Sequence, residues 1–217
     1  MLTDEKTHEK YALNDFVLIP KYAVLDPVLT RGLPPFITAT TGMDALTHAV
    51  EAYIGKSNTA QTIEDSVTAV KLIFKNLERA YREGTDMEAR ENMQKASFLQ
   101  VPHYKAYVGY VHAIAHSLGG EYNVPHGLAN AVILPMVLKA YGETIHKKLS
   151  RLAVAAGLAD KDTPYRRSSL SVVISATSRY EKEIGIGDIF RKSGKPMFRS
   201  WRIMPTRRPI PSIRFRY

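Results

Sequence analysis

Residues 41–53 read TGMDALTHAVEAY, and residues 109–127 read GYVHAIAHSLGGEYNVPHG. In the first segment, Asp44 and His48 are four residues apart, and no glycine or proline interrupts residues 44–54. Positions i and i+4 lie on the same face of an α-helix, one turn apart. The segment therefore predicts a helix that presents a carboxylate and an imidazole side by side.

The second segment repeats this spacing and adds a third histidine after a turn. His112 and His116 are four residues apart within an apolar run, and His126 follows two glycines and Pro125. Because glycine and proline favour turns, we expect His126 at the start of a new helix. The two segments together offer four residues for one metal site: Asp44, His48, His112 and His126.

The chemistry of these side chains limits the choice of ion. One carboxylate and three imidazoles suit a divalent ion of borderline softness, Fe2+ or Zn2+, better than Ca2+ or Mg2+, which prefer oxygen ligands. The residue types do not decide between iron and zinc. A lone histidine on a helix is more often a packing residue than a ligand, but two i, i+4 pairs and a further histidine favour a metal site.

Three stretches of the sequence resemble the iron-containing (group III) alcohol dehydrogenase family. They are residues 42–53, residues 89–99 with the sequence ARENMQKASFL, and residues 111–135 with the sequence VHAIAHSLGGEYNVPHGLANAVILP. The resemblance extends from about Asp4 to Asp162. It implies the helical C-terminal domain of a fold shared with dehydroquinate synthase, in a chain truncated at its nucleotide-binding side.

The resemblance also implies roles for particular residues. The family's metal ligands are an aspartate and three histidines, which fall on the four residues named above. The additional histidine, His116, is implied to lie near the nicotinamide and the reacting carbon, as a catalytic and cofactor-binding residue. Leu33, in the loop that in the family passes close to the cofactor, is implied to be a cofactor neighbour, although interdomain packing explains it equally well.

The hydrophobic pattern predicts a mainly α-helical fold. Helical patterns occupy residues 38–55, 60–83, 87–99, 108–118, 128–141 and 144–156, and no strand pattern follows residue 40. We therefore expect residues 34–162 to form a helical, bundle-like metal-binding domain, since side chains on facing helices can converge on a buried ion.

The first 33 residues follow a different pattern. Two short β-type runs, at residues 16–19 and 22–25, predict strands or extended chain. By the resemblance, residues 1–33 are a remnant of an α/β dinucleotide-binding domain together with the interdomain loop. The glycine-rich phosphate loop that the family carries upstream has no counterpart in this sequence.

Charge and cysteine content exclude several classes of partner. The formal net charge of +9 suggests nucleic acid at first, but residues 191–217 contain seven arginines, two lysines and no acidic residue, and the preceding residues are neutral in sum. We therefore expect no specific nucleic-acid partner. The sequence has no apolar run near 18 residues, which predicts no membrane partner. Its first residues are polar and it contains no cysteine, and both observations predict a cytoplasmic location.

Residues 163–217 do not continue the helical pattern. We expect this tail to be aberrant and poorly ordered, and we hypothesise that part of it is an out-of-frame translation of the family's C-terminal region. The same hypothesis covers residues 100–105, so His103 is not expected to be a ligand. Taken alone, the basic and aromatic composition of the tail would instead fit binding to RNA or acidic lipid.

These observations predict a metal-dependent alcohol dehydrogenase or aldehyde reductase. The expected reaction is hydride transfer between NAD(P)H and a small alcohol or aldehyde, in a family expected to form homodimers. A second interpretation is a catalytically inactive metal-binding fragment that lacks the cofactor domain. A metal-dependent hydrolase is disfavoured, because the sequence has no His-Asp dipeptide and the resemblance is specific.

Overall fold

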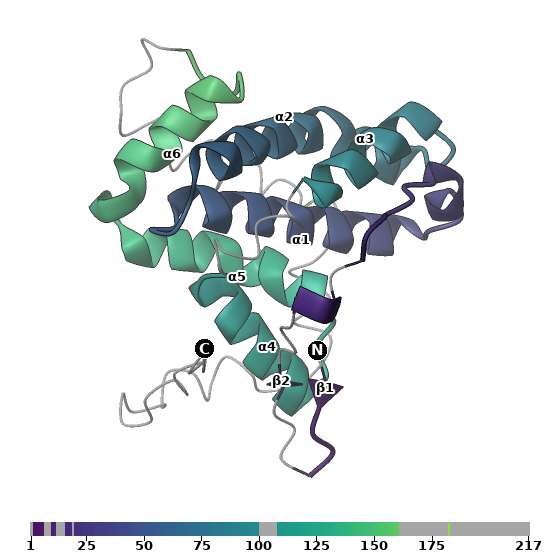
Figure 1. Cartoon of the computed structure of the whole chain (residues 1–217), viewed down its shortest axis with the longest axis horizontal. Helices are drawn as coiled ribbons and strands as arrows, with labels where there is room; N and C mark the ends of the chain where they lie inside the picture. The colour runs from purple at the N-terminus through teal and green to yellow at the C-terminus, as the bar shows by residue number, and fades with distance from the viewer. Residues whose placement is uncertain are drawn as a thin grey trace.

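The computed structural model of the chain describes residues 2–6, 10–11, 16–18, 20–99, 108–160 and 182. His103 and nearly all of the tail at residues 163–217 lie outside the described residues, so the hypotheses about them stay predictions. The fold that is described consists mainly of α-helices (Figure 1).

Six helices form the body of the molecule. They are α1 (Pro35–Ile54), α2 (Ala60–Arg82), α3 (Met87–Phe98), α4 (Tyr110–Tyr122), α5 (His126–Tyr141) and α6 (Glu143–Ala155). Each corresponds to one helical pattern in the sequence, with ends that differ by a few residues. The expected helical, bundle-like fold class is confirmed.

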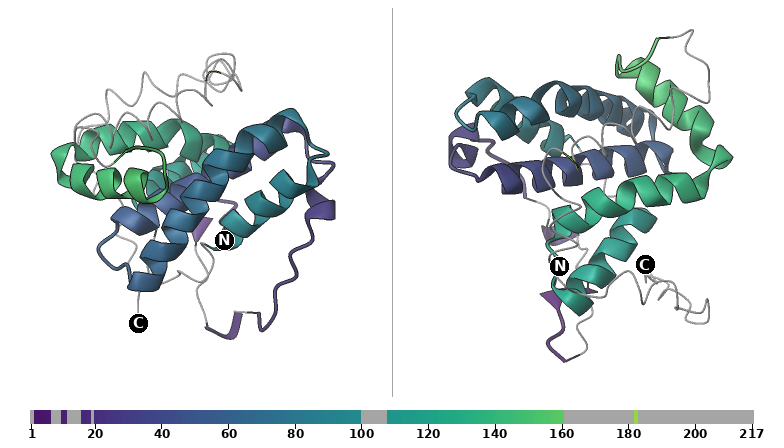
Figure 2. Two further views of the ribbon diagram at one scale, coloured as in Figure 1. Left: turned by 90° about the horizontal axis from the view of Figure 1, so that it is seen from above. Right: turned by 180° about the vertical axis from the view of Figure 1, so that it is seen from behind.

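Helix α1 lies at the centre of the domain. Figures 1 and 2 show it between α2 on one side and α5 on the other, with α4 crossing beyond α5. Its residues are apolar or small over most of the helix surface, so that it is buried on several sides at once. This central position explains why side chains of α1 can meet side chains of both α4 and α5.

The hydrophobic core is one contiguous cluster around α1. Met43 and Leu46 of α1, Leu77 of α2 and Leu134 of α5 have no exposed surface. Burial of an aliphatic side chain of this size contributes roughly 1.5 to 3 kcal/mol. Val111 and Ala115 of α4 belong to the same cluster, so the core fixes α1, α4 and α5, the three helices that carry the histidines.

Helix starts follow local capping rules. The Thr59 hydroxyl accepts a hydrogen bond of 3.2 Å from the backbone N–H of Thr62 at the start of α2. Asp86 accepts a 3.0 Å hydrogen bond from the N–H of Ala89 at the start of α3, as residue types at these positions predict. These side chains satisfy backbone donors that a helix leaves unpaired at its first turn.

The N-terminal segment differs from the expected strands. The described strands are β1 (Leu2–Thr3) and β2 (Lys10–Tyr11), which pair antiparallel, and Phe16–Leu18 forms a 3-10 helix, η1. Residues 22–25 pair with no strand in the described part of the chain. The strand prediction at residues 16–19 was therefore wrong for residues 16–18, because a β-type run becomes a strand only where a neighbouring strand pairs with it.

A second 3-10 helix, η2 (Pro27–Thr30), leads into the loop before α1. None of the described helices is both long and apolar enough to cross a membrane.

Candidate metal centre

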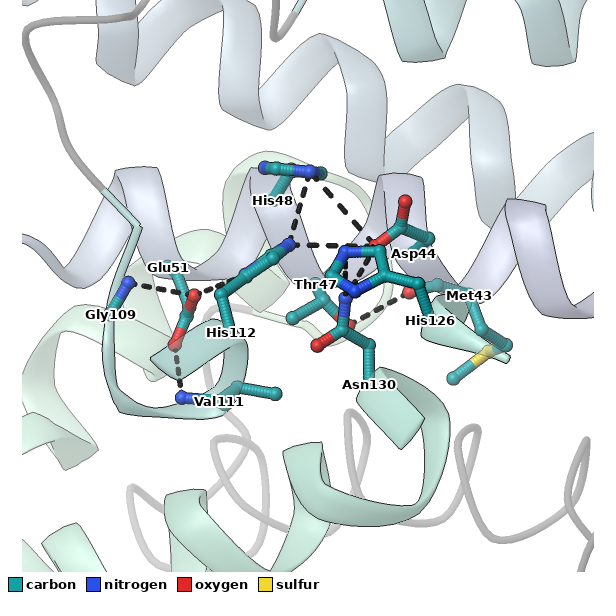
Figure 3. Close-up of polar contacts among 10 residues, drawn as sticks. All are labelled: Met43, Asp44, Thr47, His48, Glu51, Gly109, Val111, His112, His126 and Asn130. Atoms are coloured by element: carbon teal, nitrogen blue, oxygen red, sulfur yellow. Dashed lines mark hydrogen bonds and ion pairs between the residues drawn. The ribbon is translucent and has the colours of Figure 1, made fainter. Parts of the chain in front are cut away.

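Side chains of three helices meet at one point beside α1 (Figure 3). Asp44 and His48 come from α1, His112 from the first turn of α4, and His126 is the first residue of α5. The two Nε2 atoms of His48 and His112 are 3.0 Å apart. Asp44 Oδ1 is 3.5 Å from Nε2 of His112, 3.5 Å from Nε2 of His126 and 4.0 Å from Nε2 of His48.

The start of α5 reaches α1 because of a glycine. A Cβ on Gly127 would collide with the backbone carbonyl of Thr40, in the first half of α1. Glycine at this position lets α5 approach closely enough for His126 to face Asp44. The start of α5 at His126 is as expected, but Gly119 and Gly120, from which the sequence analysis expected a turn, lie inside α4, and only residues 123–125 separate the two helices.

The spacing of these atoms fits one divalent ion. Atoms that each coordinate an ion at about 2.1 Å lie roughly 3 to 3.5 Å from one another. The ligand atoms of Asp44, His48 and His112 all lie within 4.8 Å of one another. The Nε2 of His126 lies at a matching 3.5 Å from the Asp44 oxygen. The geometry thus groups Asp44, His48 and His112, with His126 next to Asp44, and in chemistry three imidazoles and one carboxylate suit Fe2+ or Zn2+.

The electrostatics of the centre are those of a cation site. Burial lowers the pKa of His48, and repulsion from His112 lowers it further, to about 4. Burial also opposes a charge on His112, but hydrogen bonds to Asp44 and Glu51 outweigh it and raise the pKa of His112 to about 9. Burial alone would raise the pKa of Asp44, whereas the neighbouring histidines hold it below its usual value. The positive charge of the centre therefore resides on His112, between two carboxylates.

Glu51 is a member of this centre that the sequence analysis did not identify. Its Oε2 is 2.7 Å from Nδ1 of His112, on the side of the ring opposite to Asp44 and His48. Glu51 is three residues after His48 and seven after Asp44, so it lies on the same face of α1. A charged residue on this face, among alanines and valine, was the signal available in the sequence.

Asn130 is the second residue that the sequence analysis missed. Its side-chain amide donates to Oδ1 of Asp44 and lies 3.1 Å from Nε2 of His126. The buried Oδ1 of Asn130 has no hydrogen-bond partner among the described residues. Asn130 follows His126 by one helical turn, so the i, i+4 rule could have found it.

His116 lies beside the centre. Its ring stacks on that of His126, with centroids 5.1 Å apart and an interplanar angle of 21°. The edge of the ring faces His112 at a centroid distance of 6.1 Å. His116 therefore borders the predicted ligands, and its expected place near the nicotinamide and its catalytic role stay predictions.

Leu33 is half-buried in the loop that precedes α1. Its carbonyl accepts a hydrogen bond of 3.3 Å from the guanidinium of the buried Arg90. Arg90 also donates to the Thr38 hydroxyl at 2.6 Å and to the Gly84 carbonyl at 3.0 Å. These contacts involve the backbone of Leu33 and not its side chain, so interdomain packing and a contact with a cofactor both stay predictions for Leu33.

The arrangement is that of a helical domain whose metal-binding side chains gather between facing helices. Residues 38–195 match the C-terminal model of the Fe-containing alcohol dehydrogenase family, which covers more than half of the chain. The chain belongs to the iron-containing alcohol dehydrogenase family, as the resemblance in its sequence predicted.

Individual relatives agree with this assignment. The chain is 40% identical over 195 residues to 1,3-propanediol dehydrogenase from Citrobacter freundii. This match covers 89% of this chain and 50% of that protein. It is 48% identical over 140 residues to alcohol dehydrogenase 4 from Schizosaccharomyces pombe. This match covers 64% of this chain and 33% of that protein. The chain thus spans about half the length, or less, of these curated relatives.

A solved structure of a 1,3-propanediol oxidoreductase has the same fold. It matches with a TM-score of 0.69 and 42% sequence identity, and the match covers 74% of this chain and 42% of that chain. The agreement in three dimensions supports both the family and the helical C-terminal fold class.

Proposed function

We propose that this chain provides the metal-binding part of a metal-dependent alcohol dehydrogenase, or aldehyde reductase. The proposed reaction is hydride transfer between NAD(P)H and a small alcohol or aldehyde. The observation that carries the proposal is the convergence of one carboxylate and three imidazoles from α1, α4 and α5. The names of the relatives, a propanediol dehydrogenase among them, support small alcohols as the substrate class.

Each of the converging residues has a proposed role. Asp44, His48, His112 and His126 hold the ion, and their donor set fits Fe2+ or Zn2+. The chemistry that such an ion supplies when bound is Lewis acidity toward a carbonyl or alcohol oxygen. The negative charge of Asp44 and the aliphatic core behind α1 keep the site anionic and shielded on its inner side.

His116 is proposed to act on the substrate side of the centre. It is half-buried, one turn after His112, and its ring lies parallel to that of His126. We propose that it relays a proton or orients the nicotinamide, because an imidazole does both near neutral pH. Leu33, at the entrance to α1, is proposed as a neighbour of the cofactor.

We also propose a division of the chain into two parts on the basis of the ion site and the family resemblance. Residues 34–162 form the metal-binding domain, and residues 1–33 belong with the nucleotide-binding domain and its linker. A location in the cytoplasm and assembly into a homodimer are proposed on the basis of the sequence and the family resemblance. The second candidate is an ion-binding unit without catalytic activity, which the same converging side chains of Asp44, His48 and His112 would also support.

Metal content, NADH binding and aldehyde reduction test the proposal directly. The purified chain is loaded anaerobically with Fe2+ or with Zn2+, and the three properties are measured on the same sample. We expect one ion per chain. Ion binding together with aldehyde reduction supports the dehydrogenase, whereas ion binding without NADH binding supports the second candidate.

Two histidine variants serve as controls for the ion site. His116→Ala is expected to keep the ion, because His116 is not a proposed ligand. His146→Ala, on α6, is expected to keep both the ion and any activity. A wild-type chain without stoichiometric metal would refute the proposed function.

A further inference from the structure

Glu51 makes an unusual set of contacts for an acidic residue. Its side chain is 3% exposed, in a helix whose neighbouring positions are aliphatic. Three donors converge on it: the backbone N–H of Val111 on Oε1, and the backbone N–H of Gly109 and the Nδ1 of His112 on Oε2. The distances are 2.8, 2.8 and 2.7 Å. A buried carboxylate is costly unless it is fully hydrogen-bonded, and here both oxygens are used.

The backbone at the start of α4 is adapted to this carboxylate. A Cβ on Gly109 would stand 2.5 Å from Oε1 of Glu51, which is too close for any side chain. Gly109 is the N-cap residue of α4 and, as a glycine, has no side chain that could accept a hydrogen bond from the first turn. Glu51 of α1 therefore takes the place of a capping side chain for α4. It accepts the backbone N–H groups of Gly109 and Val111, which lie three residues and one residue before His112.

The contact with His112 has a chemical consequence beyond packing. A carboxylate accepts hydrogen bonds only, so His112 donates to it through Nδ1–H. A neutral imidazole that carries its proton on Nδ1 has a lone pair on Nε2. That Nε2 faces Nε2 of His48 at 3.0 Å and Oδ1 of Asp44 at 3.5 Å, which is where the proposed ion lies.

We propose that Glu51 is a positioning residue for the ion: it selects the tautomer of His112 and holds the start of α4 so that Nε2 faces the centre. This inference rests on the proposed function, since it assigns a role toward the same ion. Glu51 does not touch the ion or substrate, and it acts through His112. Its negative charge, with that of Asp44, also balances a divalent cation.

Glu51→Gln tests this role with a minimal change in shape. An amide has one acceptor oxygen and one NH2 group, so either orientation of Gln opposes an N–H of α4 with another N–H. If the NH2 group faces His112, it donates to Nδ1 and the ring proton moves to Nε2, toward the ion. Carboxylates that support metal-bound histidines are typically worth about 10- to 100-fold in metal affinity. We expect a loss of that size for Zn2+.

The experiment compares the full-length wild-type chain, Glu51→Gln and Glu64→Gln by competition with a chromophoric Zn2+ chelator. Glu64 lies exposed on α2, so its replacement removes the same charge without touching the centre. Thermal unfolding of the three ion-free chains reports the purely structural effect. Weaker Zn2+ binding by Glu51→Gln alone supports the inference, and an affinity equal to that of the wild type overturns it even if the variant unfolds at a lower temperature.

A measurement on the wild type keeps the inference testable if Glu51→Gln does not fold. In the Zn2+-loaded chain with 15N-labelled histidine, NMR correlations through the imidazole ring report which nitrogen carries the proton. We expect His112 to carry it on Nδ1, and the opposite tautomer would overturn the inference. Absence of Zn2+ binding by the wild type would instead refute the proposed function and this inference together.

Discussion

The inner side of the centre beside α1 and the segment at residues 20–25 distribute polar and apolar side chains in opposite ways. On the inner side of the centre, Glu51 and His112 are buried, at 4% and 1% exposed, whereas the outer side chains, Asp44, His48 and His126, are 25% to 38% exposed. In the N-terminal segment, apolar side chains are exposed, with Tyr22 at 88% and Val24 at 90%. The inner side of the centre is enclosed because three helices pack around it, whereas a single extended segment covers none of its own side chains.

This comparison shows which interactions hold each region. Glu51 and His112 can be buried because each is hydrogen-bonded to a partner from another helix. The apolar side chains of residues 20–25 contribute little to the folded state in the arrangement described, since they remain in contact with solvent. Stability and ion binding should therefore respond strongly to changes at the first region and weakly to changes at the second.

Removal of a proposed ligand should have the largest effect. His112→Ala deletes one imidazole and leaves the buried carboxylate of Glu51 without its side-chain partner. We expect Zn2+ affinity to fall by about 100-fold or more, beyond the effect of a supporting residue. Metal analysis after dialysis measures this loss, with His146→Ala as the matched histidine control. Retention of one ion per chain in His112→Ala would exclude His112 as a ligand.

Truncation of a core side chain should lower the free energy of unfolding far more than a substitution in the exposed N-terminal segment. Leu77 has no exposed surface, and Leu77→Ala is expected to lower the free energy of unfolding by about 2 to 5 kcal/mol. Tyr22→Ser, in the exposed segment, is expected to change it by less than about 0.5 kcal/mol. Urea unfolding followed by circular dichroism gives both values. A comparable loss in Tyr22→Ser would mean that the exposed segment is covered in solution.

The pH should act in opposite directions on ion binding and on ion-free stability. The pKa of His112 is raised to about 9, above its ordinary value of 6.5, so an incoming ion must displace a proton from it below that pH. We expect the apparent affinity for Zn2+ to rise by up to about tenfold per pH unit between pH 6.5 and 9. Titrations at several pH values measure the slope, and a flat profile would argue against a proton on His112.

The ion-free chain should show the reverse trend. A raised pKa in the folded state means that the stabilising contribution of protonated His112 is fully present below pH 6.5 and is lost as the pH rises through about 9. His48, with its pKa lowered from 6.5 to about 4, is neutral in the folded chain over that window, and its protonation in the unfolded chain at the lower end of the window opposes this trend. Chemical unfolding of the ion-free chain between pH 6.5 and 9 measures the decline.

The smallest predicted effect concerns a helix cap. Thr59→Ala removes the hydroxyl that accepts the N–H of Thr62 at the start of α2, which typically costs about 1 kcal/mol. Thr68→Ala is the matched control, because its exposed hydroxyl bonds only to the preceding turn of the same helix. Equal unfolding free energies for the two variants would contradict the assigned cap.

Local geometry explains which features could be predicted from the sequence. Asp44 and His48 are brought together by one helical turn, and the helices themselves follow from apolar spacing and caps within a few residues. The pairing of Glu51 with His112 joins residues 61 positions apart, so it depends on how α1 and α4 pack. The strand or extended chain expected at residues 16–19 is a 3-10 helix at residues 16–18 for a related reason, because pairing with a neighbouring strand is also a non-local condition.

The buried guanidinium of Arg90 has a consequence for how the chain can move. It binds the carbonyl of Leu33 on one side and the hydroxyl of Thr38 on the other, and so clamps the entry to α1 onto α3. Bending between these two residues would break hydrogen bonds of a cation that is only 3% exposed. If the preceding chain moves relative to the helices, the hinge must therefore lie before Leu33. The histidine centre would then move with the helices as one rigid unit.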